Sequence, residues 1–112
     1  MTIEQIIERQ MRAFDDRDID SMMSVFSDDI RIIDFSNNKI LIDGIEECRK
    51  MYINLFEKSP NLRAEILKTI TFDNKVIVQE YIYGRNGSIE KTEQVIIFEI
   101  NKKQIRKINI IR

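Results

Sequence analysis

The side chains that can carry protons decide which chemistry this chain could perform. Its 112 residues include no histidine and a single cysteine, Cys48. Zinc sites depend on clustered Cys and His ligands, and the Ser-His-Asp and Cys-His nucleophile systems need a histidine. We therefore expect no metal site, and any proton transfer must use Asp, Glu, Lys or Tyr, a chemistry that implies no cofactor.

Asp34 is the first candidate for such a role. It belongs to the segment Ile30–Phe35, which predicts a strand, and strand periodicity puts Asp34 on one face with Ile30 and Ile32. A carboxylate that follows two apolar residues into the interior is desolvated, which raises its pKa and suits a general base. In the alternative interpretation the strand ends at Ile33, and Asp34 is a solvated loop residue.

Gln10 is the second candidate. A capping box at Thr2 and Gln5 predicts the start of a helix, and Gln10 falls on its apolar stripe between Ile7 and Phe14. A polar group in an apolar stripe needs a hydrogen-bond partner. The amide could donate to a bound molecule, or it could lie at the edge of the stripe and bond to backbone.

Helices come first and strands follow in the elements that must position these residues. Asp18 predicts the cap of a second helix that extends to Phe26, and Asp43 predicts the cap of a third helix. Strands are predicted at Ile30–Phe35, Lys39–Ile42, Leu62–Phe72, Val76–Arg85, Ser88–Ile100 and Ile105–Ile111. Short connections favour antiparallel neighbours, so residues 1–112 predict a single α+β domain with its helices on one face of a curved sheet.

The dipeptide Asn86-Gly87 predicts a two-residue hairpin turn, which would pair Arg85 with Ser88 and set the register of both strands. The polar-studded face in that register is the predicted pocket side, with Tyr81, Tyr83, Gln94 and Ile96. The opposite face, which we expect to join two copies in a homodimer, carries Val76, Val78, Glu80, Glu93, Val95 and Ile97. Glu80 and Glu93 would repel each other there.

The run Arg9–Asp34 resembles the opening of the nuclear transport factor 2-like superfamily, in its SnoaL-like and ketosteroid isomerase-like branch. Both have a helix, an acidic turn such as Asp15–Asp20, a second helix ending like Val25–Asp29, and a strand. The segments Asp43–Glu47 and Phe98–Asn101 fit the same layout. The resemblance covers essentially the whole chain. It implies a cone-shaped, cystatin-like fold, in which a strongly bent, mostly antiparallel sheet wraps around helices and leaves an apolar pocket.

The resemblance also implies roles for particular residues. In the isomerases the position of Asp34 holds the proton-moving Asp, that of Gln10 a Tyr that donates to the oxyanion, and that of Ile96 a protonated Asp. Because Gln10 is a weaker donor and Ile96 donates nothing, we expect no ketosteroid isomerase activity. The residues expected to line the pocket are Gln10, Phe14, Ile32, Tyr52, Phe56, Tyr81, Tyr83, Gln94, Ile96 and Phe98.

Two functions stay open. The first is a domain that binds a small apolar molecule. The alternative is a cofactor-independent enzyme, of isomerase, cyclase or dehydratase type, with Asp34 as general base on a small apolar carbonyl substrate. A net charge of −1 argues against nucleic acid as a partner, and no apolar run reaches the ~20 residues of a membrane span. The absence of a signal-peptide pattern and the single cysteine lead us to expect a cytoplasmic protein.

Overall fold

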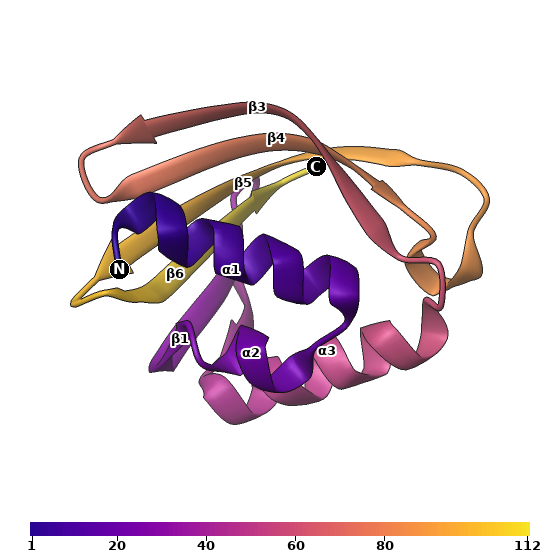
Figure 1. Cartoon of the computed structure of the whole chain (residues 1–112), viewed down its shortest axis with the longest axis horizontal. Helices are drawn as coiled ribbons and strands as arrows, with labels where there is room; N and C mark the ends of the chain where they lie inside the picture. The colour runs from indigo at the N-terminus through magenta and orange to yellow at the C-terminus, as the bar shows by residue number, and fades with distance from the viewer.

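Three helices and six strands make up the computed structural model, which describes all 112 residues (Figure 1). The helices are α1 (Ile3–Asp16), α2 (Ile19–Met23) and α3 (Ile45–Lys58). The strands are β1 (Phe26–Asp34), β2 (Lys39–Asp43), β3 (Arg63–Phe72), β4 (Lys75–Tyr83), β5 (Thr92–Asn101) and β6 (Gln104–Ile111). No helix is both long and apolar enough to cross a membrane.

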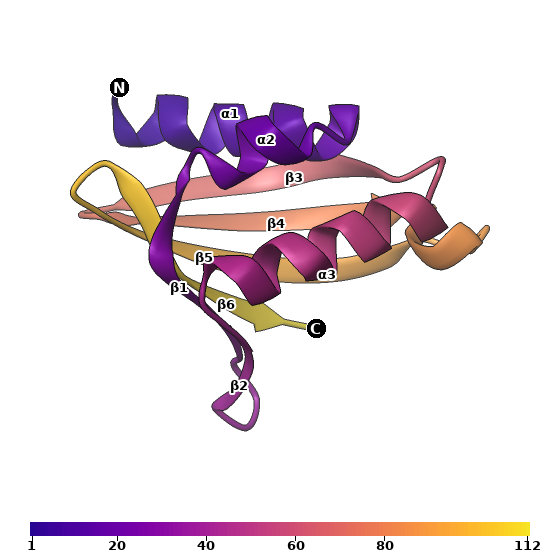
Figure 2. The same ribbon diagram turned by 90° about the horizontal axis from the view of Figure 1, so that it is seen from below.

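The strands form one curved sheet in the order β2-β1-β6-β5-β4-β3, antiparallel throughout except for the parallel pair β1 and β6. The sheet bends around the helices, as Figures 1 and 2 show from two directions. Helix α1 packs on β3 and β4, while α3 packs on β1 and β2. The predicted α+β class, with helices in the concave face of a mostly antiparallel sheet, is confirmed.

Helix α1 begins where its sequence predicts. The Thr2 hydroxyl accepts a hydrogen bond from the Gln5 N–H at 3.1 Å, and the Gln5 side chain accepts one from the Thr2 N–H at 2.8 Å. Both bonds satisfy N–H groups that have no partner inside the helix. The helix buries Ile6, Ile7 and Gln10 against the sheet, so its apolar stripe faces the core.

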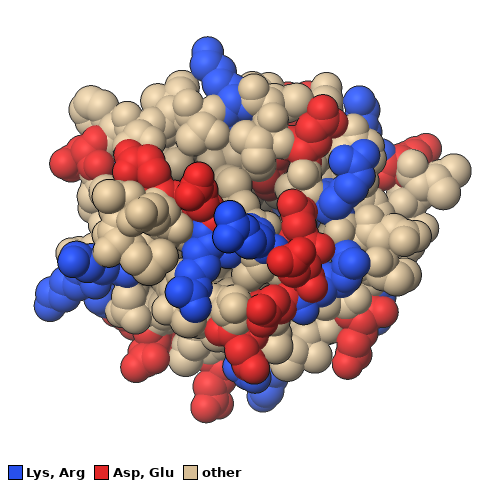
Figure 3. Space-filling model, viewed as in Figure 1, with Lys and Arg blue, Asp and Glu red and all other residues tan.

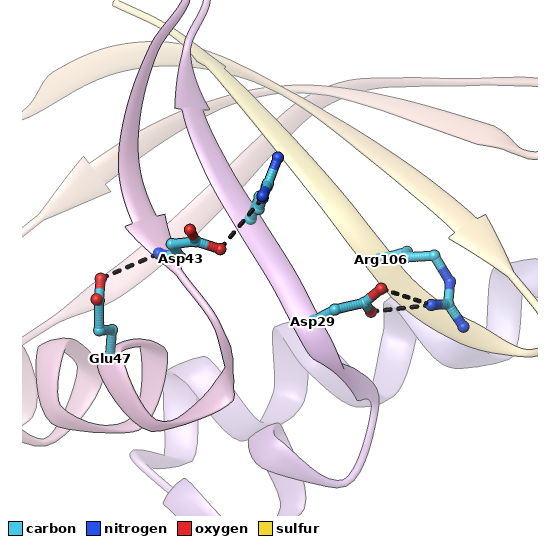
Figure 4. A network of polar contacts seen from close by, with 5 residues as sticks. Asp29, Asp43, Glu47 and Arg106 are labelled. Atoms are coloured by element: carbon cyan, nitrogen blue, oxygen red, sulfur yellow. Dashed lines mark hydrogen bonds and ion pairs between the residues drawn. The ribbon is translucent and has the colours of Figure 1, made fainter.

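Two predicted helix boundaries are wrong. The second helix ends at Met23, and Phe26 already begins β1. Asp43 does not cap α3, since it ends β2: its carboxylate pairs with Arg31 at 3.1 Å and its backbone N–H donates to Glu47 at 3.0 Å (Figure 4). Gly44 precedes the helix instead, at a φ of 97°.

Ion pairs hold the neighbouring strands of this region together. The Arg106 guanidinium contacts both carboxylate oxygens of Asp29, at 2.9 and 3.0 Å, and so ties β6 to β1 (Figure 4). Elsewhere on the surface, acidic and basic side chains are interspersed over the face that Figure 3 shows. That face therefore presents no continuous basic patch of the kind that nucleic acids select.

The predicted turn between β4 and β5 is also wrong. A longer connection runs from Gly84 through a 3-10 turn at Arg85–Gly87 to Thr92. It pairs Glu80 with Gln94, whereas the two-residue turn would have paired Gln79 with Gln94. A shift of one residue moves every side chain of one strand to the other face of the sheet.

The faces of β5 are therefore as predicted, whereas those of β4 are reversed. Val76, Val78 and Glu80 are buried on the inner face and do not belong to the outer one, where the dimer prediction had put them. Tyr81 and Tyr83 lie on the outer face and not in the pocket wall. The predicted repulsion between Glu80 and Glu93 is also wrong, because the two residues lie on opposite faces of the sheet. On the outer face, Glu93 accepts a hydrogen bond from Gln79 at 2.9 Å.

Gly84 closes one end of the fold, where the chain leaves β4 against the segment that precedes β3. Its φ is 77°, and a Cβ atom there would lie 2.5 Å from the Asn61 carbonyl oxygen. Gly87 has the same φ of 77°, but a Cβ there meets nothing within 4 Å. The two glycines share a backbone strain and differ only in the contact.

We predict that Gly84→Ala destabilises the protein more than Gly87→Ala. Both variants incur about 1–2 kcal/mol for a left-handed alanine, and Gly84→Ala adds about 1–3 kcal/mol of overpacking. Urea unfolding of the two variants measures the difference. Equal midpoints would show that the Asn61 segment moves away without cost.

Candidate functional site

A cavity of about 330 Å³ lies between the helices and the inner face of the sheet. Hydrophobic residues supply 13 of the 18 that line it. Its walls are Gln10, Met11, Phe14, Ile32, Leu41, Ile42, Met51, Tyr52, Leu55, Ala64, Glu80, Arg85, Gln94, Ile96, Phe98, Ile108, Ile110 and Arg112. A largely apolar hollow with a few polar groups is the usual form of a small-molecule site.

Strand register makes the floor of the cavity apolar along most of its length. Ile96 on β5 pairs with Ile110 on β6, and Phe98 pairs with Ile108. All four side chains point inward, because residues at every second position share a face. The opposite wall includes Phe14 from α1 and residues from α3. A ligand lying along this floor therefore meets hydrocarbon on both sides.

One end of the floor is polar. Glu80 on β4 pairs with Gln94 on β5, and the register of β5 with β6 places Arg112 beside Gln94, since Val95 pairs with Ile111. The Gln94 amide donates to the Glu80 carboxylate at 2.7 Å and accepts from Arg85 at 3.3 Å. Gln94 thus connects a carboxylate to a guanidinium through its own amide.

Burial changes the acidity of this polar end. Glu80 is only 8% exposed, and desolvation raises its pKa above the usual glutamate range. The hydrogen bond from Gln94 and the charge of Arg85 act in the opposite direction and do not cancel this effect. Desolvation also lowers the pKa of Arg85. Glu80 is therefore a carboxyl group that takes up a proton more readily than a surface glutamate.

The structure brings most of the predicted pocket residues together. Those that line the cavity are Gln10, Phe14, Ile32, Tyr52, Gln94, Ile96 and Phe98. Phe56 lies behind the wall, with its ring 6.1 Å from that of Phe14 and 5.8 Å from that of Tyr52. Gln10 is only 6% exposed and lines the cavity, as the apolar stripe of its helix predicted.

The two outer tyrosines have partners of their own. The Tyr83 hydroxyl donates to Glu65 at 2.7 Å, and the Arg63 guanidinium lies 4.0 Å from the Tyr83 ring centre. The Lys91 ammonium lies 3.9 Å from the centre of the Tyr81 ring. These contacts hold both rings on the outer face of the sheet, away from the cavity.

Asp34 does not line the cavity. Its carboxylate accepts hydrogen bonds from the Ser36 hydroxyl at 2.7 Å and the Ser36 N–H at 3.0 Å. These bonds, helped by the charges of Arg112 and Lys39, hold the pKa of Asp34 below its usual range. The predicted rise in pKa required a desolvated position inside the cone, and the turn after β1 holds the carboxylate elsewhere.

Sequence reasoning missed the three charged residues of the cavity, Glu80, Arg85 and Arg112. Glu80 follows Val76 and Val78 at strand spacing, and this alternation was the available signal. Outside the cavity, Cys48 is fully buried and desolvation raises its pKa to about 12, so its thiol is not a nucleophile. No three His, Cys, Asp or Glu side chains gather closely enough to hold a metal ion.

Comparison with known families decides the relationship. The family model of the SnoaL-like domain matches residues 7–108. The chain belongs to the SnoaL-like family. The match spans nearly the whole sequence and includes most of the cavity lining, whereas Ile110 and Arg112 lie beyond its last residue. No curated protein has a sequence that matches this one.

Solved structures share the fold of this SnoaL-like domain. A cystatin-fold protein from Novosphingobium aromaticivorans aligns with a TM-score of 0.91 at 20% identity, covering 100% of this chain and 99% of its own. A candidate SnoaL-like polyketide cyclase from Jannaschia aligns with a TM-score of 0.76 at 21% identity, covering 96% and 84%. TerC, co-crystallised with polyporic acid, aligns with a TM-score of 0.79 at 13% identity, covering 96% and 88%.

We predict opposite stability effects for two neutralised carboxylates of this SnoaL-like domain. The raised pKa of Glu80 means that the folded state holds the proton more tightly than the unfolded state does. The free energy of unfolding therefore falls as pH rises from the ordinary glutamate pKa through the raised one. Glu80→Gln should therefore raise the melting temperature at neutral pH, with a gain that vanishes in acid below the ordinary glutamate pKa. A change of about 1 kcal/mol shifts the melting temperature by roughly 4 °C in a domain of this size.

Asp34→Asn is the matched control. The pKa of Asp34 is lowered, so its contribution is present above the ordinary aspartate pKa and is lost as pH falls. This variant should melt slightly lower at neutral pH. Thermal unfolding across a pH series measures both variants. A Glu80→Gln protein less stable than wild type at neutral pH would mean that Gln94 and Arg85 stabilise an ionised Glu80.

Proposed function

We propose that this SnoaL-like domain binds a small, mostly apolar molecule in the cavity under its curved sheet. The observation that carries the proposal is the division of the cavity into a long apolar floor and one polar end. Apolar walls supply most of the binding free energy, and a few placed polar groups fix the orientation of the ligand. A volume of about 330 Å³ suits a compact organic molecule.

Structural neighbours support the same class of function by analogy. One is named as a candidate polyketide cyclase, and another was crystallised with polyporic acid. Their sequence identities to this chain are 21% and 13%, which is enough to support a shared fold but not a shared ligand. The ligand of this domain must therefore be sought from its own cavity.

The register of the sheet suggests how a ligand lies. Its apolar part would cover Ile96, Phe98 and Ile110, and its polar part would face the row formed by Glu80 and Gln94. The Gln10 amide approaches from α1 and can donate one neutral hydrogen bond. A molecule that lacks a polar group would leave the buried Glu80 without a further partner, at a cost in affinity.

A cofactor-independent enzyme is the second candidate function, and the position of Glu80 favours it. Glu80 takes the role first considered for Asp34, because it is a buried carboxyl group inside the cavity with a pKa shifted toward neutrality. As a general base it would accept a proton from a carbon beside a carbonyl group, and the electron pair of the broken C–H bond would form an enolate. Ketosteroid isomerisation remains unexpected, since Ile96 gives the enolate oxygen no donor.

We also propose that a second copy of the chain covers the outer face of the sheet. Phe72 is 72% exposed there and Ile70 is 47% exposed, beside outward-facing residues of β4, β5 and β6. The Lys75–Glu99 ion pair, at 3.7 Å, neutralises one basic and one acidic side chain of this face within the chain. An identical face can bury this exposed apolar surface when two copies associate. The apolar residues of this face are Ile70, Phe72, Ile77, Val95, Ile97 and Ile111.

We predict that octanol, a neutral apolar probe, binds to the wild type and not to Ile110→Trp. The larger side chain would fill the cavity, and the packing strain should stay within about 1–3 kcal/mol. Ile53→Trp, on the exposed side of α3, is the matched control and should bind octanol like the wild type. Titration calorimetry measures all three. Unchanged binding in Ile110→Trp would place the probe outside the cavity and remove the proposal.

We predict that Val95→Glu weakens the dimer. The variant puts an unpaired carboxylate in the centre of the outer face, where association would desolvate it. Sedimentation velocity at micromolar concentration should show a dimer for wild type and a monomer for the variant. Glu46→Gln, on the exposed side of α3, should leave the dimer intact. A wild-type monomer at the same concentration would contradict the second-copy proposal.

A further inference from the structure

The polar end of the cavity holds more positive than negative side chains. Arg85 and Arg112 both line it, and Glu80 is the only carboxylate in the lining. The chain's ion pairs are Arg31–Asp43, Arg49–Asp20, Lys75–Glu99 and Arg106–Asp29, so neither cavity arginine is neutralised in this way. The charge of Arg112 contributes to lowering the pKa of Arg85, so the two guanidinium groups repel each other.

Carboxylates outside the cavity form no ion pair with either arginine. Asp34 is close enough to be attracted by the charge of Arg112, but its carboxylate is hydrogen-bonded to Ser36. Asp15 influences Glu80, but its carboxylate accepts the Ala64 N–H at 3.0 Å. Neither aspartate lines the cavity. A molecule inside therefore meets two guanidinium groups and one buried carboxyl group.

The chemistry of these groups selects a particular partner. Arg85 is partly buried and Arg112 is exposed, and two like charges that line one cavity are stabilised by an anion between them. Guanidinium groups bind carboxylates in a planar, two-point geometry. A ligand that carries an ammonium or hydroxyl group in place of the carboxylate cannot form this pair of hydrogen bonds. The Nε atom of Arg85 is buried and has no hydrogen-bond partner within the chain. Burial without compensation costs free energy, which an acceptor group on the ligand would recover.

We propose that the ligand of this cavity is an amphipathic carboxylic acid, with its carboxylate held between Arg85 and Arg112 and its apolar body lying on Ile96, Phe98 and Ile110. This inference rests on the proposed function and names the class of its ligand. Gln94 keeps Arg85 in position through the 3.3 Å hydrogen bond and separates it from Glu80. The Glu80 carboxyl then lies near the carboxylate end of the acid and not near its apolar end.

Three probes of matched length test the proposal: octanoate, octanol and octylammonium. Titration calorimetry at neutral pH and low salt should show octanoate binding about tenfold or more tightly than octanol, since hydrogen bonds to charged groups are the stronger ones. Octylammonium should bind more weakly than octanol. Added salt should weaken octanoate binding and leave octanol binding unchanged, because only the former involves charge.

Arginine variants separate the head group from the apolar body. Arg112→Gln should lower octanoate affinity about tenfold and leave octanol affinity unaltered. Arg85→Lys keeps the charge but loses the planar fork, so it should lower octanoate affinity less than Arg85→Gln does. Arg49→Gln, at the exposed pair with Asp20, is the matched control and should bind all probes like the wild type. Melting curves without ligand verify that each variant is folded.

The outcomes distinguish this inference from the function on which it rests. If octanoate and octanol bind equally and neither binds to Ile110→Trp, the cavity binds small apolar molecules as proposed, but its preference for a carboxylic acid is disproved. Tighter binding of octylammonium would also overturn it and would make Glu80 the counter-ion of a cationic ligand. If none of the three probes binds, the proposed function fails and the acid preference fails with it.

Discussion

The hydrogen bond between Glu80 and Gln94 is the interaction on which the polar end of this domain depends. A carboxylate buried in an apolar wall is unfavourable unless donors stand beside it, and here the donor comes from the neighbouring strand at 2.7 Å. Only one register of β4 and β5 brings the two side chains together. That register depends in turn on the long connection that starts at Gly84, where no Cβ atom fits against Asn61. A backbone constraint outside the cavity thus decides which charges lie inside it.

The same register divides β4 between two environments. Glu80 points into the cavity, and the next residue, Tyr81, points outward against the Lys91 ammonium. Because successive residues of a strand alternate, the cavity wall and the outer face are built from one strand without sharing a side chain. Substitutions such as Glu80→Gln and Val95→Glu therefore probe the two surfaces separately. Distant sites without common partners usually have additive effects on stability.

Local signals in the sequence predicted the local structure well. The capping box at Thr2 and the apolar stripe of α1 are set by neighbouring residues, and the resemblance carried in Arg9–Asp34 placed them in the correct fold. The faces of β4 were not predictable in the same way, because each of its alternating sets mixes apolar and polar residues. The sequence around Asn86-Gly87 is compatible with a two-residue turn and with the longer observed connection. The two connections differ by one residue in the register of β4 and β5. The observed connection starts at Gly84, whose contact with the segment before β3 is tertiary and cannot be predicted from neighbouring residues.

The location of the arginines bears on the choice between binding and catalysis. A base at Glu80 lies at the same end of the cavity as Arg85 and Arg112, so the carbon that it could reach is the one beside the ligand's head group. Protons next to a carboxylate are weakly acidic, and their removal creates a second negative charge that needs donors of its own. Both guanidinium groups would already be occupied by the carboxylate, and Gln10 adds only a neutral amide. A simple acid should therefore be bound and not converted, whereas a ketone beside the carboxylate would give the enolate a second oxygen to carry its charge.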